Sequence, residues 1–180
     1  MKTPIKMLYT KRAIMAICIL SFCCQFNFAN AQKLFFVFAH AAYEQPYNHG
    51  LMSQYKFGLG GEAGAGVKLL GKTYATGTVG YSNFFDKNGG PGTLTYVPVR
   101  FGLRQNFLPL NILYLHADVG TAGVKNNSTS GSRFTGSFGG GVKLGPLDAQ
   151  IDYELIGKKN TDPAGSNGWV AFKLGWRFGL

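Results

Sequence analysis

The feature that most constrains the fold is a strict two-residue alternation at the C-terminus, in the segment VAFKLGWRFGL. Successive side chains of a β-strand point to opposite faces, whereas one face of a helix repeats every 3.6 residues. The intervening positions hold only small or cationic residues. The segment therefore predicts a strand with one wholly apolar face, formed by Val170, Phe172, Leu174, Trp176, Phe178 and Leu180.

The same alternation recurs along the rest of the chain. It is clear at 55–69, 75–82, 96–104, 113–120, 134–144 and 147–155. A further strand is expected at about 33–43, where the apolar residues are too continuous to tell one face from the other. The chain also has 26 glycines, and Gly costs a helix about 1 kcal/mol relative to Ala. We therefore predict an all-β, eight-stranded antiparallel fold.

The connections between the expected strands alternate in length. Short ones lie at Gly71-Lys72, 106–111 and Gly145-Pro146. Longer polar ones lie at 44–52, 86–92, 125–131 and 158–167. In an up-and-down meander, alternate connections fall at opposite ends of the sheet, so we expect one end to have short turns and the other to have longer loops. Bacterial outer-membrane barrels show this asymmetry.

The N-terminus has the pattern of a secretory signal peptide. Residues 1–12 carry four positive charges, an apolar run follows to Cys24, and Ala29-Asn30-Ala31 forms a small-x-small site. We expect cleavage after Ala31, which leaves 32–180 as the barrel domain. The run is shorter than the roughly 20 residues of a membrane-spanning helix, and Phe22 before Cys23 disfavours a lipoprotein signal. Cys18, Cys23 and Cys24 would leave with the signal, so no disulfide is expected.

The positive charge of the chain does not indicate nucleic-acid binding. The formal net charge is +10, but four of the 18 basic residues lie in the expected signal, so the mature chain would carry +6. A nucleic-acid surface needs clustered Lys and Arg on one exposed face. Lys158-Lys159 is the one adjacent basic pair after the signal.

The composition of the two strand faces decides what surrounds the barrel. The polar face is mostly Gly, Ser and Thr with few charges, which suits the inside of a narrow barrel better than the outside of a soluble one. The large apolar face would then meet lipid. We predict a salt-bridged interior formed by Lys56, Glu62, Lys68, Arg100, Arg104, Asp118, Lys143, Asp148, Asp152, Glu154, Lys173 and Arg177. Interface aromatic girdles are predicted at Tyr55, Tyr96, Phe134, Trp169, Trp176 and Phe178.

The terminal segment GWVAFKLGWRFGL and the stretches FGLGGEAGAGVKL and LYLHADVG resemble a known group of proteins. They are similar to the small bacterial outer-membrane β-barrel superfamily, which includes OmpA-like, OmpX-like and porin-family barrel domains. The resemblance covers 33–180 and implies a transmembrane β-barrel in the outer membrane of a Gram-negative cell. It also implies insertion by the outer-membrane assembly machinery, which would read the last strand. Many members end on Phe, whereas here Phe178 is third from last.

The chemical motifs are weak. Gly58 to Ala63 matches G-x-G-x-x-A, but that dinucleotide motif needs a following helix, which the continuing alternation disfavours. His116 and Asp118 share the inward face, yet no His-x-Ser arrangement accompanies them, and His40 and His49 have no evident partners. No metal or cofactor site is expected. We predict a non-enzymatic, monomeric barrel with an envelope-structural or surface-interaction role. The alternatives are a lipid-modifying barrel enzyme and a soluble periplasmic ligand-binding barrel.

Overall fold

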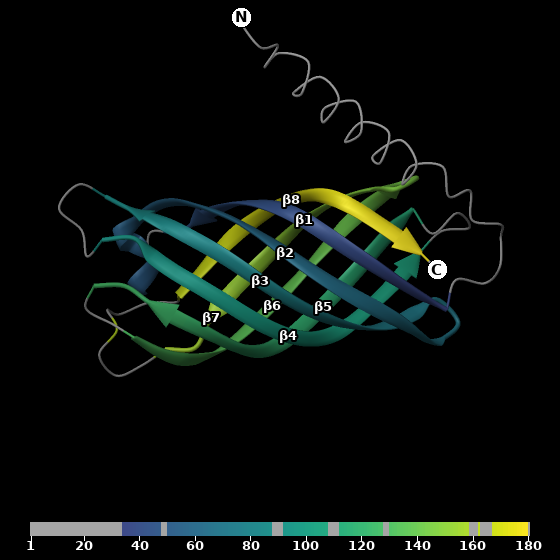
Figure 1. Ribbon diagram of the computed structural model, residues 1–180, viewed down its shortest axis with the longest axis horizontal. Helices are drawn as coiled ribbons and strands as arrows, with labels where there is room; N and C mark the ends of the chain where they lie inside the picture. Colours follow the sequence, from purple (N-terminus) through teal and green to yellow (C-terminus); the bar gives the residue numbers. More distant parts are fainter. Residues whose placement is uncertain are drawn as a thin grey trace, which may run out of the picture. The chain divides into compact units, whose positions relative to one another are not determined.

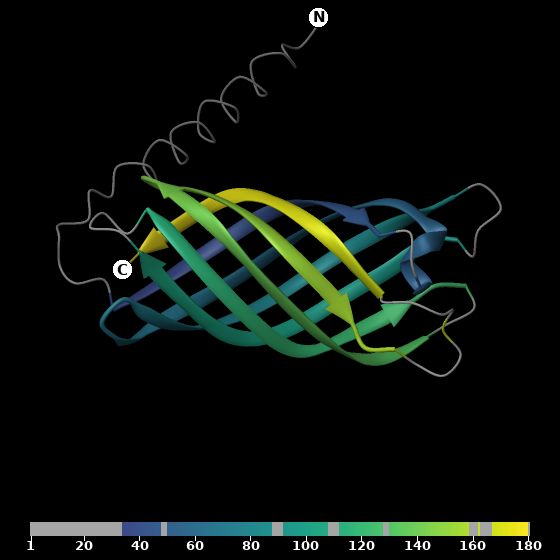
Figure 2. The same ribbon diagram turned by 180° about the vertical axis from the view of Figure 1, so that it is seen from behind.

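A computed structural model describes residues 34–47, 50–87, 92–107, 112–127, 130–158, 162 and 167–179. The predicted signal peptide and Leu180 lie outside these residues. The described chain forms one closed barrel in which each strand pairs antiparallel with the next and β1 pairs with β8 (Figures 1 and 2). The strands are β1 (Phe35–Pro46), β2 (Tyr55–Leu70), β3 (Thr73–Asp86), β4 (Leu94–Phe107), β5 (Leu113–Lys125), β6 (Ser130–Leu144), β7 (Leu147–Ile156) and β8 (Asn167–Gly179). The eight-stranded antiparallel prediction is confirmed.

The two ends of the barrel differ as the connection lengths predicted. At the turn end, Gly71 and Gly145 begin two-residue turns with φ of 57° and 62°. Gly adopts this left-handed region without strain, which suits tight hairpins. At the opposite loop end, the 3-10 helix η1 (Gly50–Gln54) follows β1 and lies at the mouth of the barrel (Figure 2). In the part of the chain that the structure describes, no helix is long and apolar enough to cross a membrane.

The first strand, which the sequence could not orient, has a clear phase. Phe36, Phe38 and His40 are buried, whereas Phe35 and Val37 are exposed. This order continues to the end of β1, where Glu44 is buried and Tyr43 is exposed. The strand therefore adds one histidine and one carboxylate to the interior.

Close backbone approach explains why small residues fill much of the inward face. A Cβ added at Gly175 would overlap the backbone of Ala39 and His40 on the neighbouring strand. Gly in a strand commonly marks such a place. The narrow interior is thereby left to a few long charged side chains.

Candidate functional site: the sealed interior

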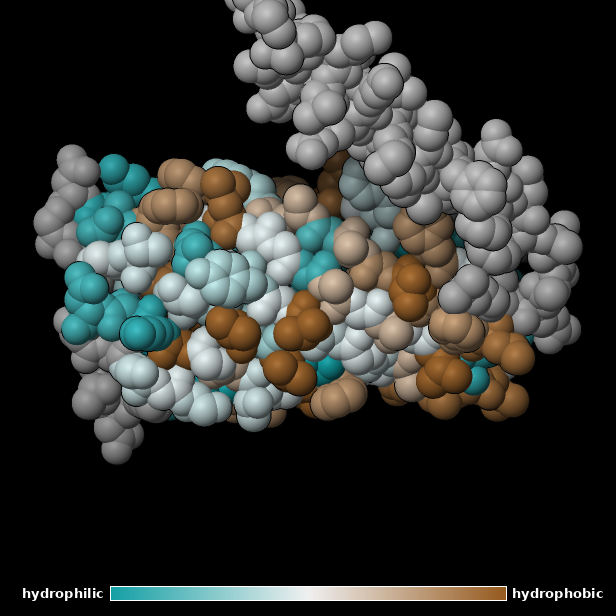
Figure 3. All heavy atoms as spheres, viewed as in Figure 1, coloured by the Kyte–Doolittle hydropathy of each residue, from teal (hydrophilic) through white to brown (hydrophobic). Residues whose placement is uncertain are grey.

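The barrel wall has inverted polarity over most of its length. Trp176 and Ile151 on the exterior are each 56% exposed, whereas Lys173 in the interior is 4% exposed. Apolar side chains spread over the wall while hydrophilic ones gather at the loop end (Figure 3). This arrangement confirms the predicted orientation of the two strand faces, because a soluble barrel would bury the apolar face.

A central cluster of five charged residues fills the middle of the barrel. Lys173 Nζ lies 2.7 Å from Glu62, 2.9 Å from Asp152 and 2.7 Å from Glu154. Arg100 donates to Glu62 at 2.8 Å and to Glu154 at 2.6 Å. These residues come from β2, β4, β7 and β8, and they meet because an eight-stranded barrel is just wide enough for side chains.

His116 links the central cluster to β5. Its Nδ1 lies 2.6 Å from Asp118 Oδ2, and its Nε2 lies 2.7 Å from Asp152 Oδ1. A carboxylate only accepts hydrogen bonds, and a neutral imidazole has one N–H. Both contacts are therefore satisfied only by an imidazolium. Thr76 donates to the same Asp118 at 3.0 Å, which fixes that carboxylate.

A second cluster, the turn-end cluster, surrounds Asp148. Arg104 and Arg177 lie 3.2 and 3.4 Å from its Oδ2, and Tyr114 donates to its Oδ1 at 2.5 Å. The Arg104 guanidinium also lies 3.4 Å from the centre of the Tyr114 ring, within cation–π range. His40 Nε2 is 3.9 Å from Asp148, and its Nδ1 is 3.3 Å from Glu62. His40 therefore lies between the two clusters.

The two clusters hold most of the ionisable side chains of the described interior. The interior acids are Glu44, Glu62, Asp118, Asp148, Asp152 and Glu154, and the permanent cations are Arg100, Arg104, Lys173 and Arg177. Arg133 is buried at the loop end, where it pairs separately with Asp162. Buried charges are tolerated when they are paired, and His40 and His116 each lie beside two of the carboxylates.

Three predicted members of the interior network lie elsewhere. Lys56 is exposed, so the prediction that it points inward is wrong. The pairing of β2 with β3 shifts between Tyr55 and Phe57, and this irregularity turns Tyr55 inward instead. Lys68 and Lys143 have the predicted inward phase, but they are half-buried near the turn end rather than in the central cluster.

Half of the predicted aromatic girdle is not on the exterior. Phe134, Trp176 and Phe178 are exposed as predicted. The girdle prediction is wrong for Tyr55, Tyr96 and Trp169, which are 1%, 1% and 0% exposed. Trp169 and Tyr96 follow the inward phase of Lys173 and Arg100 on their own strands, and the bulge turns Tyr55 inward.

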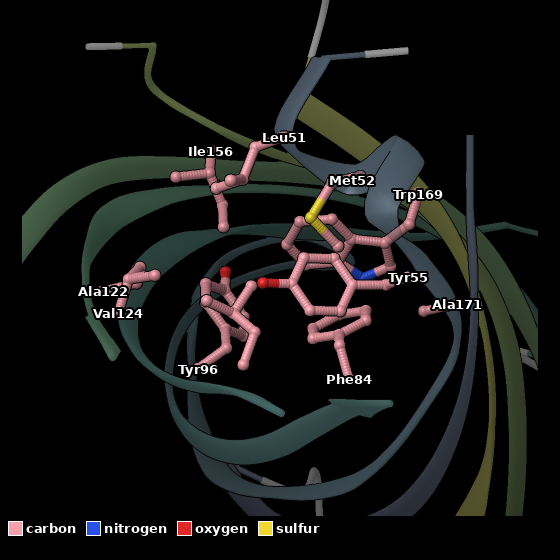
Figure 4. Packing of buried hydrophobic residues seen from close by; sticks show 11 residues of the cluster. Leu51, Met52, Tyr55, Phe84, Tyr96, Ala122, Val124, Ile156, Trp169 and Ala171 are labelled. Carbon is pink, nitrogen blue, oxygen red and sulfur yellow. The ribbon is translucent and has the colours of Figure 1, made fainter. Parts of the chain in front are cut away.

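These three aromatics belong to an apolar cluster inside the loop end, which we call the loop-end plug (Figure 4). Phe84 and Tyr96 each lie 5.1 Å from Trp169 in edge-to-face arrangements. Met52 of η1 is fully buried among them, and the Leu51 N–H donates to Asn167 Oδ1 at 2.7 Å. The plug comprises Leu51, Met52, Tyr55, Phe84, Leu94, Tyr96, Ala122, Val124, Ile156, Trp169 and Ala171.

The outer wall beside the plug carries polar as well as apolar side chains. Thr95 donates to Asn83 at 3.0 Å, and Tyr43 donates to Gln45 at 3.1 Å. An aromatic group lies on the same part of the exterior, where the centre of the Phe57 ring is 6.1 Å from that of Tyr43 and 5.0 Å from that of Phe85. The loop end thus has an apolar interior, unlike the charged interior of the central and turn-end clusters.

Little empty space remains beside the central cluster in the part of the chain that the structure describes. Two internal cavities lined by described residues measure about 20 and 10 Å³. A single water needs about 10–15 Å³ by this kind of measure. One cavity lies beside Thr78, His116 and Lys173, and the other lies beside Glu44 and Glu154. These two cavities therefore have room for isolated waters but not for a small-molecule ligand.

The weak chemical motifs have structural explanations within the described residues. Gly58 to Ala63 lies inside β2, so no helix follows the glycines. The Ser137 hydroxyl donates to Asp118 at 3.3 Å, and both His116 nitrogens face carboxylates. No group of three or more His, Cys, Asp or Glu side chains is arranged to hold a metal ion in the described part of the chain.

The closed topology and the inverted wall define a class, the small eight-stranded antiparallel barrels of the outer-membrane type. Neisserial surface protein A is similar in structure, with 18% identity over 81% of this chain and 97% of that one and a TM-score of 0.57. The attachment invasion locus protein Ail of Yersinia pestis shows 14% identity over 82% of this chain and 100% of that one, with a TM-score of 0.54. The structure of Ail in a phospholipid bilayer nanodisc gives a TM-score of 0.51 at 14% identity, over 79% of this chain and 99% of that one. No family model and no curated protein matches the sequence.

Proposed function

We propose that this chain is an integral outer-membrane β-barrel protein without enzymatic activity, with an envelope-structural or surface-interaction role. The observation that carries the proposal is the inverted wall, with Phe172 and Trp176 outside and Lys173 and Arg177 inside. In hydrocarbon, a closed barrel satisfies every backbone group and leaves no strand edge. The fold shared with Neisserial surface protein A and Ail supports the same location.

The packed interior supports a structural role over transport or ligand binding. Ligand pockets usually enclose about 300 Å³ or more. The interior cavities here measure about 20 and 10 Å³, and the loop-end plug lies above them. General diffusion porins use about 16 strands to keep an aqueous lumen. The surface left for interactions is the loop end with η1.

A lipid-modifying enzyme is the alternative from a different class. The base that the sequence suggests for it, His116, lies 2.6 and 2.7 Å from two carboxylates, and both of its nitrogens are engaged. A catalytic base needs a nucleophile within hydrogen-bond reach. Incubation of the purified barrel with lipid A or phospholipid should release no acyl chain. Release that disappears in His116→Ala, with the barrel still folded, would instead establish the enzyme.

Cell fractionation combined with gel migration tests the location. We expect the protein in the outer-membrane fraction, extracted only by detergent, and a faster band for unheated than for heated samples because a closed barrel resists SDS. Recovery from the soluble periplasm without detergent would overturn the proposal in favour of the periplasmic barrel. The C-terminal strand is proposed as the segment that the assembly machinery reads. Replacing Phe178 and Trp176 together by Ser should then lower the amount assembled.

A further inference from the structure

One interior acid, Glu44 of β1, stands apart from the ion pairs. It is 2% exposed, and of the six interior acids it is the one that pairs with no cation among the described residues. Its Oε1 accepts a hydrogen bond from the Ser82 hydroxyl at 2.8 Å. Its Oε2 is buried and has no hydrogen-bond partner in the described part of the chain. Half of this carboxyl group is therefore unsatisfied.

The cations closest to Glu44 are already engaged by other acids. Arg100 and Lys173 line the same cavity of about 10 Å³ as Glu44. Arg100 makes two ion pairs and Lys173 makes three, all with other carboxylates. The charged and hydroxyl-bearing side chains that face this cavity from the surrounding strands are Glu62 of β2, Ser82 of β3, Tyr96 and Arg100 of β4, Glu154 of β7 and Lys173 of β8.

The free oxygen of Glu44 lies at the floor of the loop-end plug. Glu44 pairs with Gly58 where β1 meets β2. A Cβ added at Gly58 would lie 2.7 Å from both Glu44 Oε2 and the ring of Phe84, which belongs to the plug. Tyr96, another plug residue, lines the same small cavity as Glu44. Oε2 is thus placed beside aromatic side chains rather than beside a cation.

A buried carboxylate without a cation is costly, and such a group takes up a proton instead. A neutral carboxylic acid still accepts from Ser82 and gains an O–H donor. The adjoining cavity is close to the size of one water, which would accept that hydrogen bond.

We propose that Glu44 is a proton-binding site beneath the loop-end plug: it is a neutral acid in the closed barrel, and its ionisation loosens the plug. Ionisation places an unpaired negative charge beside Phe84 and on the same cavity as Glu154. Water drawn in to solvate that charge would separate the plug from the central cluster. The inference concerns the closed barrel itself and does not depend on its role in the envelope.

The first experiment compares the wild type with Glu44→Gln, because the amide has the shape of the neutral acid and cannot ionise. The mature chain is folded into phosphatidylcholine vesicles, and urea unfolding is followed by the folded gel band. The pH is varied between about 5.5 and 7.5, where a glutamate of the unfolded chain is ionised. A folded state that binds one extra proton loses stability as the pH rises, and its unfolding equilibrium constant increases about tenfold per pH unit.

We expect this constant to rise about tenfold more steeply per pH unit in the wild type than in Glu44→Gln. Both proteins retain His40 and His116, so the difference between their slopes isolates Glu44. Parallel profiles, or a Glu44→Gln chain that does not fold, would overturn the proposal, because either result would mean that position 44 needs a carboxylate.

Glu154→Gln is the matched control, since Glu154 lines the same cavity but is paired with Arg100 and Lys173. It should be less stable than the wild type and should keep the wild-type slope. A slope that is lost in Glu154→Gln as well would assign the proton to Glu154 instead and would contradict the proposal.

A second measurement reports on the plug itself. Trp169 lies in the plug, and Trp176→Phe leaves it as the single tryptophan. In that background, quenching of Trp169 by aqueous iodide should rise as the pH is raised through the alkaline range. The rise should be absent when Glu44→Gln is added. An equal rise in both proteins would show that another group loosens the plug.

Discussion

At the scale of single residues, Lys173 makes more ion pairs than any other buried cation that the structure describes. Its ammonium group lies within 2.9 Å of Glu62, Asp152 and Glu154, and only 4% of the residue is exposed. Breaking a buried pair by removing one partner leaves the other charges uncompensated, which costs far more than losing a surface pair. Arg100 and the two histidines would be the cations left beside these carboxylates, with Gln150 donating to Glu62 and Asp152.

Lys173→Met should therefore lower the free energy of unfolding by about 3–5 kcal/mol. Urea unfolding in phosphatidylcholine vesicles, followed by the folded gel band, measures the change. Lys72→Met at the exposed turn provides the control and should change the stability by under about 0.5 kcal/mol. A loss for Lys173→Met as small as that of the control would mean that the interior is hydrated and loosely paired. The same comparison applies to Asp152→Ala.

At the scale of elements, η1 and the start of β2 act together. The register shift between Tyr55 and Phe57 turns the Tyr55 ring inward, where it lies 6.3 Å from Phe84. η1 then covers the mouth, with Met52 fully buried and Leu51 tied to Asn167. A short 3-10 helix has little stability of its own, so its place depends on these contacts.

Met52→Ala tests this dependence. Truncating a fully buried Met should cost about 2–5 kcal/mol, because the plug loses contacts and retains a cavity. Gln54→Ala on the same helix, where the side chain is half-buried, is the control and should stay within about 0.5 kcal/mol. Thermal unfolding of both variants in the same vesicles gives the comparison. Equal effects would show that η1 lies loosely on the mouth.

At the scale of the whole molecule, the interior changes from charged to apolar toward the loop end. The two tryptophans of the chain report on different parts of it, because Trp169 is fully buried in the plug and Trp176 is 56% exposed on the exterior. Brominated lipids quench only tryptophans that they contact. Single-tryptophan variants therefore read the two environments separately.

We expect Trp169→Phe, which keeps Trp176, to be strongly quenched in brominated-lipid vesicles. Trp176→Phe, which keeps Trp169, should be quenched weakly both by these lipids and by aqueous iodide. The ratio of fluorescence with and without bromine is the measurement, and unheated gel bands confirm that both variants are folded. The reverse order of quenching would contradict the inverted wall.

The sealed interior also predicts the electrical behaviour of the molecule. Cavities of about 20 and 10 Å³ hold isolated waters, and the plug separates them from the loop side. Purified barrel in a planar bilayer should give no steady stepwise conductance, whereas a 16-stranded porin measured alongside should conduct. Reproducible steps that scale with the amount of barrel would show that the interior opens.

Alternation predicted the strands, their inward and outward faces and most of the buried charges, because side-chain direction in a strand is a local property with a period of two. It failed at Lys56 and Tyr55, where one irregular pairing reverses the phase. It also gave no phase for β1, so His40 and Glu44 were missed. For Trp169 and Tyr96 the alternation itself indicates the inward face, so the girdle prediction contradicted the local phase of these two residues.

Closure of the barrel decided which charges meet. Lys173 and Glu62 are 111 positions apart, and no local pattern pairs them. The position of the apolar plug above the ion clusters likewise depends on the strand registers, which bring Tyr55, Phe84, Tyr96 and Trp169 to one level. The periodicity of the sequence predicts the direction in which each side chain points. The partners that a side chain contacts across the interior depend instead on how all eight strands are staggered and joined.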